Sequence, residues 1–329
     1  MIMNSIINKV AVIGLGNIAT RHRRNLKALF PGAELLVMSA SGRILEEAIS
    51  DSDGIVASVE ALIEAKVELV IVASPAPFHA QHAIPLIEAG IPTLIEKPVT
   101  TTKEDADSIQ KSIDEHGTPV AVGYCLRYLP SAKELKRLLD NETIGTLYNA
   151  HIEIGQYLPD WRPSKDYRDC VSANRHLGGG ALFELSHELD YAQWLLGPLH
   201  LQHALLRSSE ELNLEVEDMA DITALTDTGA VATIHLDFLQ RKAHRKCSFV
   251  GSHGRIDWDL IQNQLTLTTA TETRVLYSEP EWDKNLMYLA MITDFIQMIN
   301  QAPHSCIEMN SATSTVHFIN QIKVSTEVL

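Results

Sequence analysis

The sequence predicts an α/β domain with a doubly wound parallel sheet, followed by an α+β domain with an open, mostly antiparallel sheet. Short apolar runs alternate with helical stretches over the first 125 residues, whereas polar and apolar residues alternate within later runs. The length of 329 residues agrees with this division, because one domain usually takes about 150 residues. We therefore expect a first domain over residues 1–124 and a second over 125–329.

The strands of the first domain are predicted from apolar runs that contain few polar residues. They lie at residues 9–13, 34–38, 69–73, 93–95 and 119–123. Helical spacing marks 18–29, 81–89 and 102–116, and the last of these opens with Thr101 or Thr102 as a cap. Continuous apolar strands separated by helices are typical of a parallel sheet that is covered on both faces.

The second domain is predicted to combine an open sheet with several helices. Helices are expected at 131–139, 179–196, 282–301 and 311–328, with strands at 147–155 and repeatedly between 199 and 268. His235 and Asp237 alternate with apolar neighbours, which is typical of a strand with one covered face. A loop rich in Pro, Trp and Arg follows the strand at 147–155 and runs to about 174.

Charge and composition argue against several classes of protein. The 27 basic residues against 42 acidic ones give a net charge of −15, which is unsuited to binding the phosphate backbone of nucleic acids. No apolar run approaches the roughly 18–20 residues of a membrane span, and the first residues lack the regions of a secretion signal. The four cysteines form no CxxC pattern and no histidine pair has a completing ligand, so we expect a cytoplasmic protein without a metal.

A glycine-rich turn follows the first predicted strand. Gly14, Gly16 and Ala19 form the pattern G-x-G-x-x-A between a buried strand and a helix. In dinucleotide-binding proteins the first glycine permits the tight turn, the second lets the backbone approach the pyrophosphate, and the third small residue allows close packing. The backbone at Asn17 and Ile18, where the helix starts, then faces the phosphates. The pattern alone is weak, but its place in a βαβ arrangement indicates a dinucleotide site.

The end of the second predicted strand bears on which dinucleotide binds. Proteins that select NAD(H) usually carry an acidic residue there, which binds the ribose 2′-hydroxyl. This chain has Ser39, Ser41 and Arg43 instead, and three arginines between 21 and 24 add positive charge. Two hydroxyls and a guanidinium can bind a 2′-phosphate, so we expect NADP(H) to be favoured over NAD(H). The alternative is that Arg43 starts the next helix and faces solvent.

Four motifs occur in order along nearly the whole chain. They are the G-x-G-x-x-A turn, Ala73-Ser74-Pro75 with His79, the triplet Glu96-Lys97-Pro98, and Gly178-Gly179-Gly180 followed by His187 and Asp190. Together they resemble the glucose–fructose oxidoreductase/inositol dehydrogenase (Gfo/Idh/MocA) family, and the triplet is the most specific of them. The resemblance implies a Rossmann domain followed by an open-faced α/β domain, with the active site between them. It also implies oxidation or reduction of a secondary alcohol of a sugar, polyol or nucleotide sugar.

The resemblance assigns roles to residues of the first domain. Lys97 would hydrogen-bond the reacting oxygen and orient nicotinamide and substrate, with Glu96 supporting it at the cofactor. Ser74, Pro75 and His79 would lie at the nicotinamide ribose. Independently of the family, a lysine at the carboxyl end of a parallel strand points to the crevice where ligands bind, and its ammonium can stabilise a developing alkoxide. The alternative for Lys97 is a solvated loop lysine, and for His79 a surface histidine.

In the second domain, Glu184, His187 and Asp190 are expected to share one face of a helix, because they are three residues apart. An imidazole is suited to taking the hydroxyl proton as hydride leaves, so His187 is the candidate general base and Glu184 a catalytic partner. The chain departs from the commoner family pattern here, since the acid is Glu rather than Asp and precedes the histidine by three residues rather than four. The two roles are therefore open to redistribution, and Asp190 is either structural or a substrate ligand.

Further substrate ligands are expected in two segments. Tyr124 and Arg127 follow the last strand of the first domain and match a stretch that borders the substrate in the family. Trp161 and Arg162 lie in the long loop, where aromatic faces can stack on sugar rings and guanidinium groups can bind carboxylate or phosphate. The alternative for that loop is a lid packed by its own aromatic residues.

The leading interpretation is an NAD(P)-dependent oxidoreductase acting on a sugar, sugar acid or nucleotide sugar. One alternative is a redox-assisted lyase or glycosidase with tightly held NAD, and another is a cofactor-sensing regulator without catalysis. Retention of both Lys97 and His187 argues against the regulator. We also expect a homodimer or homotetramer that pairs through the second sheet, provided that the exposed face of this sheet is apolar.

Overall fold

The computed structural model describes residues 7–326, which form two compact units. Unit 1 contains the chain up to Cys125 together with Asn285–Val316, and unit 2 contains Leu126–Lys284 and the residues from His317 onward. The chain passes from unit 1 to unit 2 between Cys125 and Leu126, next to the predicted boundary at 124/125. The return of residues 285–316 to unit 1 differs from the predicted division, which placed everything after 124 in the second domain.

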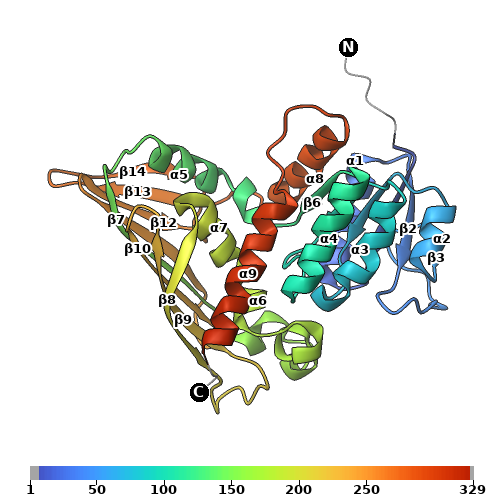
Figure 1. The fold of residues 1–329 in the computed structure, drawn as a ribbon, viewed down its shortest axis with the longest axis horizontal. Helices are drawn as coiled ribbons and strands as arrows, with labels where there is room; N and C mark the ends of the chain where they lie inside the picture. The colour runs from blue at the N-terminus through green and yellow to red at the C-terminus, as the bar shows by residue number, and fades with distance from the viewer. Residues whose placement is uncertain (1–6, 327–329) are drawn as a thin grey trace. The chain divides into compact units, whose positions relative to one another are not determined.

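Unit 1, of which Figure 1 labels β2, β3 and β6, is built on six parallel strands. Their order is β3-β2-β1-β4-β5-β6. They are β1 (Lys9–Ile13), β2 (Glu34–Met38), β3 (Gly54–Val56), β4 (Leu69–Val72), β5 (Thr93–Ile95) and β6 (Val120–Val122). This is the doubly wound order of dinucleotide-binding sheets. The predicted fold class is confirmed for this unit, and β3 is a strand that the prediction lacked.

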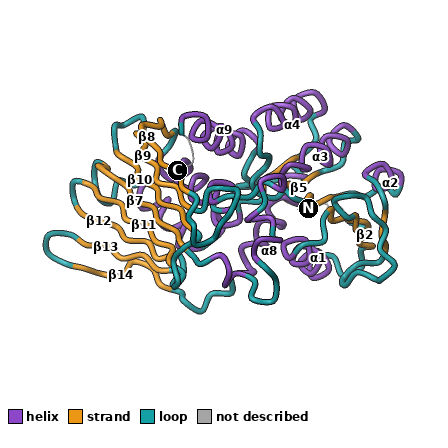
Figure 2. The backbone as a smooth tube through the Cα atoms, turned by 90° about the horizontal axis from the view of Figure 1, so that it is seen from below, coloured by secondary structure: helices purple, strands orange, loops and turns teal. Residues whose placement is uncertain are grey.

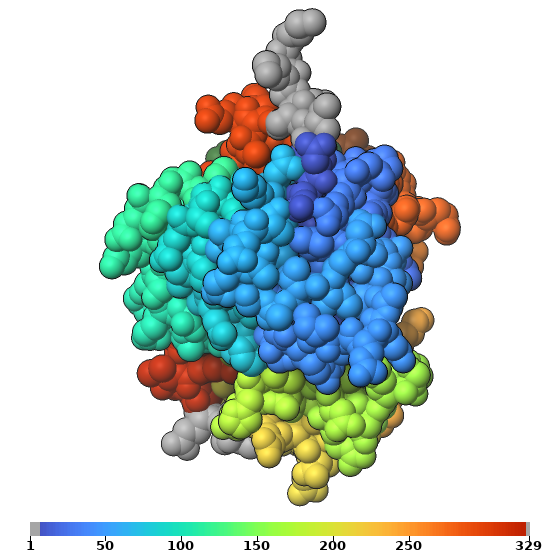
Figure 3. All heavy atoms as spheres, turned by 90° about the vertical axis from the view of Figure 1, so that its right-hand side faces the viewer, coloured from blue at the N-terminus to red at the C-terminus, as the bar shows by residue number. Residues whose placement is uncertain are grey.

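The helices of unit 1 pack beside this sheet (Figure 2). They are α1 (Asn17–Leu29), α2 (Val59–Glu64), α3 (His79–Glu88), α4 (Lys103–His116) and α8 (Asn285–Ile299). Helix α4 begins after Thr102, whose hydroxyl accepts a hydrogen bond from the Asp105 amide, as the sequence predicts. The first third of the chain, blue to blue-green in Figure 3, forms the face of unit 1 seen there.

Two contacts explain why residues 285–316 belong to unit 1. The Val122 amide at the end of β6 donates to the Ile307 carbonyl oxygen at 2.9 Å. Asn25 of α1 and Asn285 of α8 exchange side-chain hydrogen bonds at 3.3 and 2.9 Å. The late helix α8 therefore packs on α1, the first helix of the described residues.

Unit 2 is built on an eight-stranded sheet in the order β14-β13-β12-β11-β7-β10-β9-β8. Its strands are β7 (Leu147–Gly155), β8 (Leu199–Arg207), β9 (Met219–Thr226), β10 (Val231–Asp237), β11 (His244–Gly251), β12 (Gly254–Asp259), β13 (Gln264–Thr268) and β14 (Thr273–Ser278). Only the β7–β10 pair is parallel among the pairs of these strands, which confirms the predicted mostly antiparallel sheet.

Helices cover one face of the unit 2 sheet. They are α5 (Pro130–Asp140), α6 (Ala181–Glu184), α7 (Ser186–Leu196) and α9 (Met309–Ser325), of which α9 has residues in both units. Trp258 of β12 is buried on this face, where its ring meets Tyr191 of α7 at 5.2 Å and its indole donates to Ser131 of α5 at 2.8 Å. Residues 327–328 of the predicted last helix lie outside the described residues.

The predicted single helix over 179–196 is wrong in one respect. The chain forms α6 and α7 instead, and Leu185 between them has φ −98° and ψ +25°, which is outside the α-helical range. No helix within residues 7–326 has both the length and the apolar character that crossing a membrane requires.

Candidate functional site

The glycine-rich turn has the geometry that a dinucleotide needs. Gly14 has φ +117°, and a Cβ atom there would lie 2.3 Å from the Ala73 carbonyl oxygen, so only glycine fits. Gly16 is exposed, and no atom lies within 4 Å of a Cβ built on it. It precedes α1 without a side-chain cap, while Ala19 is fully buried. The amides at the start of α1, at Asn17 and Ile18, therefore border open space, which fits a pyrophosphate.

The loop after β2 holds the three residues predicted to select NADP(H). Ser39 is buried, and its hydroxyl donates to the Arg43 carbonyl oxygen at 2.9 Å. Ser41 and Arg43 have exposed side chains, and no helix starts at Arg43. The hydroxyl of Ser39 is thus used within the loop. The side chains of Ser41 and Arg43 are the ones exposed to a phosphate in solvent.

The three arginines of α1 face different partners. Arg23 is buried and donates to the Ser50 carbonyl oxygen at 2.9 Å, and Arg24 lies 3.4 Å from the Asp51 carboxylate. The Arg21 guanidinium stacks over the Tyr288 ring of α8 at 4.6 Å. These contacts hold α1 to its neighbours in unit 1.

Histidines join the loops that follow β4 and β5. His79 is buried, with Nε2 at 2.7 Å from the Ser74 carbonyl oxygen and Nδ1 at 3.1 Å from that of Val99. Burial lowers the pKa of His79 despite these two carbonyls. The Ser74 hydroxyl in turn lies 3.0 Å from Nδ1 of His82. His79 therefore ties the two loops together, with Pro75 half-buried beside it.

The Glu96-Lys97-Pro98 triplet stands at the carboxyl end of β5. Glu96 is buried, and its carboxylate accepts the Lys97 amide at 3.1 Å and contacts Nε2 of His22 at 2.7 Å. Lys97 is half-buried, and its bond to Pro98 is cis. Sequence reasoning missed His22. A polar residue on the buried face of α1, three residues after Ala19 and four before Leu26, was the available signal.

Two predicted substrate ligands of unit 2 pair with each other. Arg127 donates from Nε and Nη2 to the two carboxylate oxygens of Asp190, at 2.8 and 2.6 Å. The Arg127 guanidinium lies 5.6 Å from the centre of the Trp194 ring. Burial raises the pKa of Asp190, and the charge of Arg127 opposes that rise. Asp190 therefore binds Arg127. Tyr124, another predicted substrate ligand, is buried after β6 and belongs to unit 1.

Glu184 and His187 lie on separate helices, because the chain breaks at Leu185. Glu184 ends α6 and accepts a hydrogen bond from the Ser172 hydroxyl at 2.7 Å. His187 is half-buried in the first turn of α7. The expected shared face of one helix is therefore corrected, since Asp190 continues α7 but Glu184 does not. Ser172 is a further partner that sequence reasoning missed.

The loop after β7 packs as short turns. It forms 3-10 turns at Leu158–Trp161, Tyr167–Asp169, Val171–Ala173 and Arg175–Leu177. The Trp161 ring meets the edge of Phe238 at 5.3 Å, and its indole donates to the Gln156 carbonyl oxygen at 3.2 Å. Arg162 lines a small pocket with Tyr167, Cys170 and Ser172. This pocket brings Arg162 to the residue that binds Glu184.

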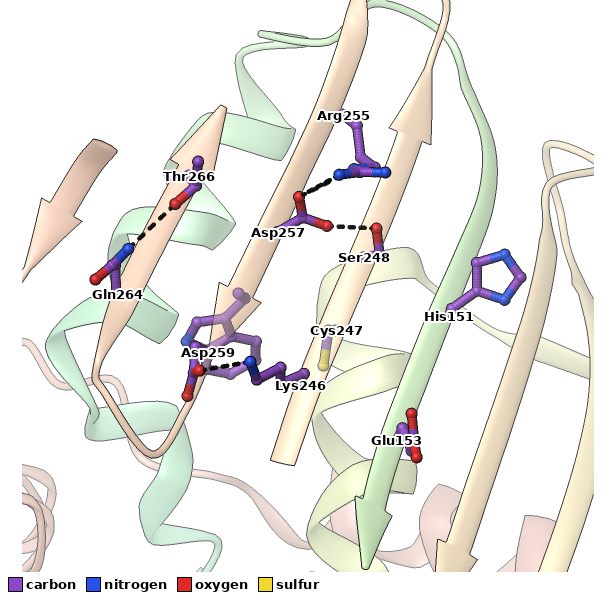
Figure 4. Close-up of a pocket in the computed structure, with 11 residues that line it drawn as sticks. His151, Glu153, Lys246, Cys247, Ser248, Arg255, Asp257, Asp259, Gln264 and Thr266 are labelled. Atoms are coloured by element: carbon purple, nitrogen blue, oxygen red, sulfur yellow. Dashed lines mark hydrogen bonds and ion pairs between the residues drawn. The ribbon is translucent and has the colours of Figure 1, made fainter. Parts of the chain in front are cut away.

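The open face of the unit 2 sheet carries a polar groove of about 460 Å³ (Figure 4). Lys246 pairs with Asp259 at 3.0 Å, and Asp257 pairs with Arg255 at 2.9 Å and accepts from the Ser248 hydroxyl at 2.7 Å. This face differs from the apolar surface on which the predicted pairing of subunits depended. Alternation along β7, β11 and β12 places the charged residues here and the apolar ones under the helices.

No group of three or more His, Cys, Asp or Glu side chains within the described residues is arranged to hold a metal ion.

Comparisons with known proteins agree with this fold. The profile described as "Oxidoreductase family, NAD-binding Rossmann fold" matches residues 8–124, and that of the "GFO/IDH/MocA C-terminal domain" matches 132–257. A solved structure of levoglucosan dehydrogenase in complex with NADH superposes with a TM-score of 0.84. It is 18% identical and covers 97% of this chain and 96% of its own.

Curated relatives match part of the chain. Inositol 2-dehydrogenase 3 of Saccharopolyspora erythraea is 31% identical over 200 residues, which is 57% of this chain and 53% of that protein. A protein of Mediterraneibacter gnavus named 2,7-anhydro-N-acetylneuraminate hydratase is 28% identical over 131 residues, which is 40% of this chain and 34% of that protein. The chain thus spans about half the length of the first of these relatives. With both family profiles matched in order on a six-stranded Rossmann sheet and a mostly antiparallel sheet, the chain belongs to the Gfo/Idh/MocA oxidoreductase family.

Proposed function

We propose that the protein is a nicotinamide-dependent oxidoreductase that transfers hydride to or from a secondary alcohol of a sugar, sugar acid or nucleotide sugar. The observation that carries the proposal is Lys97 at the carboxyl end of β5, with Glu96 buried beside it, in a sheet whose first turn fits a dinucleotide. Ligands of open parallel sheets bind at this edge. The relative named inositol 2-dehydrogenase 3 supports a polyol or sugar alcohol as the substrate class.

Each candidate residue has a task in this proposal. The bound nicotinamide would supply the hydride acceptor or donor. Lys97 donates a hydrogen bond to the reacting oxygen and stabilises its developing negative charge. His187 takes the hydroxyl proton on a ring nitrogen, and Glu184 orients it or shares that role. Arg127, Trp161, Arg162 and Tyr124 bind the substrate, and Asp190 holds Arg127.

We further propose that NADP(H) is favoured over NAD(H). The loop after β2 has no acid in its first five residues, and it exposes Ser41 and Arg43. An acid there would repel a 2′-phosphate, whereas a guanidinium attracts it. The nicotinamide ribose would lie near Ser74, Pro75 and His79. The part of His79 would be to hold together the two loops that follow β4 and β5.

Two parts of the proposal concern the protein in the cell. A homodimer or homotetramer that pairs through the unit 2 sheet stays a prediction, which light scattering tests. The polar open face means that such pairing would rest on charge complementarity more than on apolar burial. A cytoplasmic location is the other prediction, and cell fractionation tests it.

Nicotinamide absorbance during incubation with NAD⁺ or NADP⁺ and a panel of polyols, sugar acids and nucleotide sugars tests the function. Appearance of reduced cofactor with one substrate class supports the oxidoreductase. A substrate consumed without net cofactor reduction would support the redox-assisted lyase, a class that the relative named as a hydratase keeps open. Cofactor binding without turnover of any sugar would support the regulator.

A further inference from the structure

A buried pair joins the first helix of the chain to the triplet. His22 of α1 is fully buried, and its Nε2 lies 2.7 Å from a carboxylate oxygen of Glu96, whose exposed fraction is 6%. The two residues are 74 positions apart in the sequence. A carboxylate buried to this degree is costly unless it is hydrogen-bonded, so His22 compensates Glu96 directly.

The rest of the Glu96 carboxylate is also confined. Its second oxygen accepts the amide of Lys97 at 3.1 Å. A Cβ atom on Gly123, at the end of β6, would lie 3.1 Å from the carboxyl carbon and from both oxygens. The carboxylate therefore fits between the His22 ring, the Lys97 backbone and the bare Cα of Gly123. Any shift of Glu96 would move the peptide from which the Lys97 side chain leaves.

We propose that His22 is a positioning residue for Lys97. His22 acts through Glu96: it fixes the Lys97 backbone and keeps a negative charge beside the Lys97 ammonium. The proposal rests on the proposed function, because that function gives Lys97 its catalytic task. It adds a residue 75 positions earlier in the chain that the family motifs quoted above do not include.

The surroundings of His22 support a role directed at Glu96. In the described part of the chain, Nδ1 of His22 has no hydrogen-bond partner, so its directional interaction is the one with Glu96. Its ring packs edge-to-face with Tyr288 of α8, with ring centres 6.1 Å apart, and the Arg21 guanidinium lies over the same Tyr288 ring, 4.6 Å from its centre. Burial raises the pKa of Tyr288, so Tyr288 stays neutral.

The charge of Glu96 depends on these neighbours. Burial by itself raises the pKa of Glu96, but the hydrogen bond and charge of His22, together with the charge and amide of Lys97, lower it by more. His79 is a further titratable neighbour of Glu96. Burial lowers the pKa of His79, which favours its neutral form. Loss of His22 removes the largest of the effects that favour the Glu96 carboxylate. Glu96 then takes up a proton at higher pH, and Lys97 loses the adjacent negative charge.

The test compares His22→Leu with His22→Gln, whose amide nitrogen can replace the Nε2 donor. We expect His22→Leu to lower kcat about 10- to 100-fold with little change in cofactor affinity, since a displacement of about 1 Å has an effect of that size. As the pH is lowered, the activity of His22→Leu should begin to fall at a higher pH than that of the parent. His22→Gln should recover most of the loss of kcat. Asn25→Leu, which removes another buried polar group of α1, is the matched control and should leave kcat unchanged.

A second readout does not need turnover. The rate at which an amine-reactive acylating reagent labels Lys97, followed by mass spectrometry, reports the neutral amine. Without the Glu96 charge, Lys97 should be labelled faster at a given pH in His22→Leu than in the parent or in Asn25→Leu. If labelling changes but Lys97→Ala keeps normal kcat, the proposed function fails and the positioning role stands. If Lys97→Ala is inactive but His22→Leu has normal kcat and normal labelling, the positioning role is overturned.

Gly123→Ala keeps the proposal testable if His22→Leu does not fold. Gly123 has no positive φ, so alanine is compatible with its backbone, and the added methyl group must displace the Glu96 carboxylate. We expect a partial loss of kcat with the same change in Lys97 labelling as in His22→Leu. Normal kcat and labelling in Gly123→Ala, with the Glu96 carboxylate displaced in a crystal structure of that variant, would refute the proposal.

Discussion

The candidate residues of the two units are held in different ways. In unit 1 they follow parallel strands, and buried partners far away in the sequence fix them, as His22 fixes Glu96 and His79 fixes the loops after β4 and β5. In unit 2 they lie on short helices and 3-10 turns, and their partners are Asp190 for Arg127 and Ser172 for Glu184. A residue that directly follows a parallel strand has a fixed place at the edge of the sheet. In unit 2, by contrast, the break at Leu185 lets the chain accommodate the changed spacing between Glu184 and His187. Substitutions in each unit test this difference.

The largest effect is expected at Lys97 in unit 1. Lys97→Ala should lower kcat by roughly two to four orders of magnitude, because the group that stabilises the developing alkoxide is lost. Cofactor affinity should be nearly unchanged, since the glycine-rich turn does not involve this side chain. Steady-state kinetics and a cofactor-binding titration measure both quantities. A kcat near that of the parent would show that the strand-end position has no catalytic meaning.

His187 should show a comparable loss if unit 2 supplies the base. His187→Asn keeps an amide of similar size that cannot accept the proton, so oxidation should slow by roughly 10²- to 10⁴-fold. In the parent, kcat/KM should rise with pH as the imidazole loses its proton. Glu184→Gln should give a smaller loss if the carboxylate only orients the ring. The opposite ranking, with the pH dependence lost in Glu184→Gln, would exchange the two roles and would follow from the helix break.

Asp190 should affect substrate binding more than turnover. Asp190→Asn removes the charge that Arg127 meets with two hydrogen bonds, so the guanidinium loses its fixed orientation. We expect KM to rise about 10-fold, with a smaller change in kcat. Glu188→Gln is the control, because Glu188 is a buried acid of the same helix that pairs with Arg245 at 2.6 and 3.0 Å. An equal rise of KM in both variants would mean that α7 was disturbed as a whole.

Arg43 should affect only the choice of cofactor. Arg43→Ala should weaken NADP⁺ binding roughly 5- to 30-fold, which is the scale of one charge-assisted hydrogen bond, and leave NAD⁺ binding almost unchanged. Fluorescence titration with both cofactors measures the ratio. Tighter binding of NAD⁺ than of NADP⁺ by the parent protein would overturn the proposed preference.

The smallest effect concerns stability, on the open face of unit 2. A hydrogen bond with Asp237 and one with Asp221 raise the pKa of His235 to about 9, against the effect of burial. A raised folded-state pKa means that the contribution to stability is complete below the unfolded imidazole value of about 6.5 and is lost as pH rises through about 9. His235→Gln should therefore lower Tm by about 2–4 °C near pH 6 and hardly at all near pH 10. A difference in Tm that is independent of pH would contradict this assignment.

Much of the fold could be predicted from the sequence, because buried parallel strands leave continuous apolar runs. The strands at 9–13, 34–38, 93–95 and 147–155 were predicted with the bounds that the structure has. Strand β3 and helix α2 escaped prediction because β3 is three residues long and only half-buried, and α2 has six residues. The return of α8 to unit 1 depends on contacts such as Asn25 with Asn285, which no local pattern contains.

The candidate site could be predicted only where sequence spacing decides the geometry. Gly14 and Lys97 follow directly from a strand and its turn, and both lie where such residues are expected. The break at Leu185 could not be foreseen, since residues three apart fit one face whether or not the helix continues through them. His22 was within reach, because a fully buried histidine on an apolar face requires a polar partner.

The division of unit 1 into two stretches of chain also sets an order for its folding during synthesis. Residues 285–316 are made after all of unit 2 up to Lys284, about 160 residues later than Cys125. At roughly 5–20 residues per second, the ribosome takes roughly 8–30 s to deliver them. During that time the face of α1 that carries Asn25 and His22 lacks its contacts with Asn285 and Tyr288 of α8. A nascent chain of this protein therefore keeps this face of α1 open to chaperones and proteases until α8 has been made.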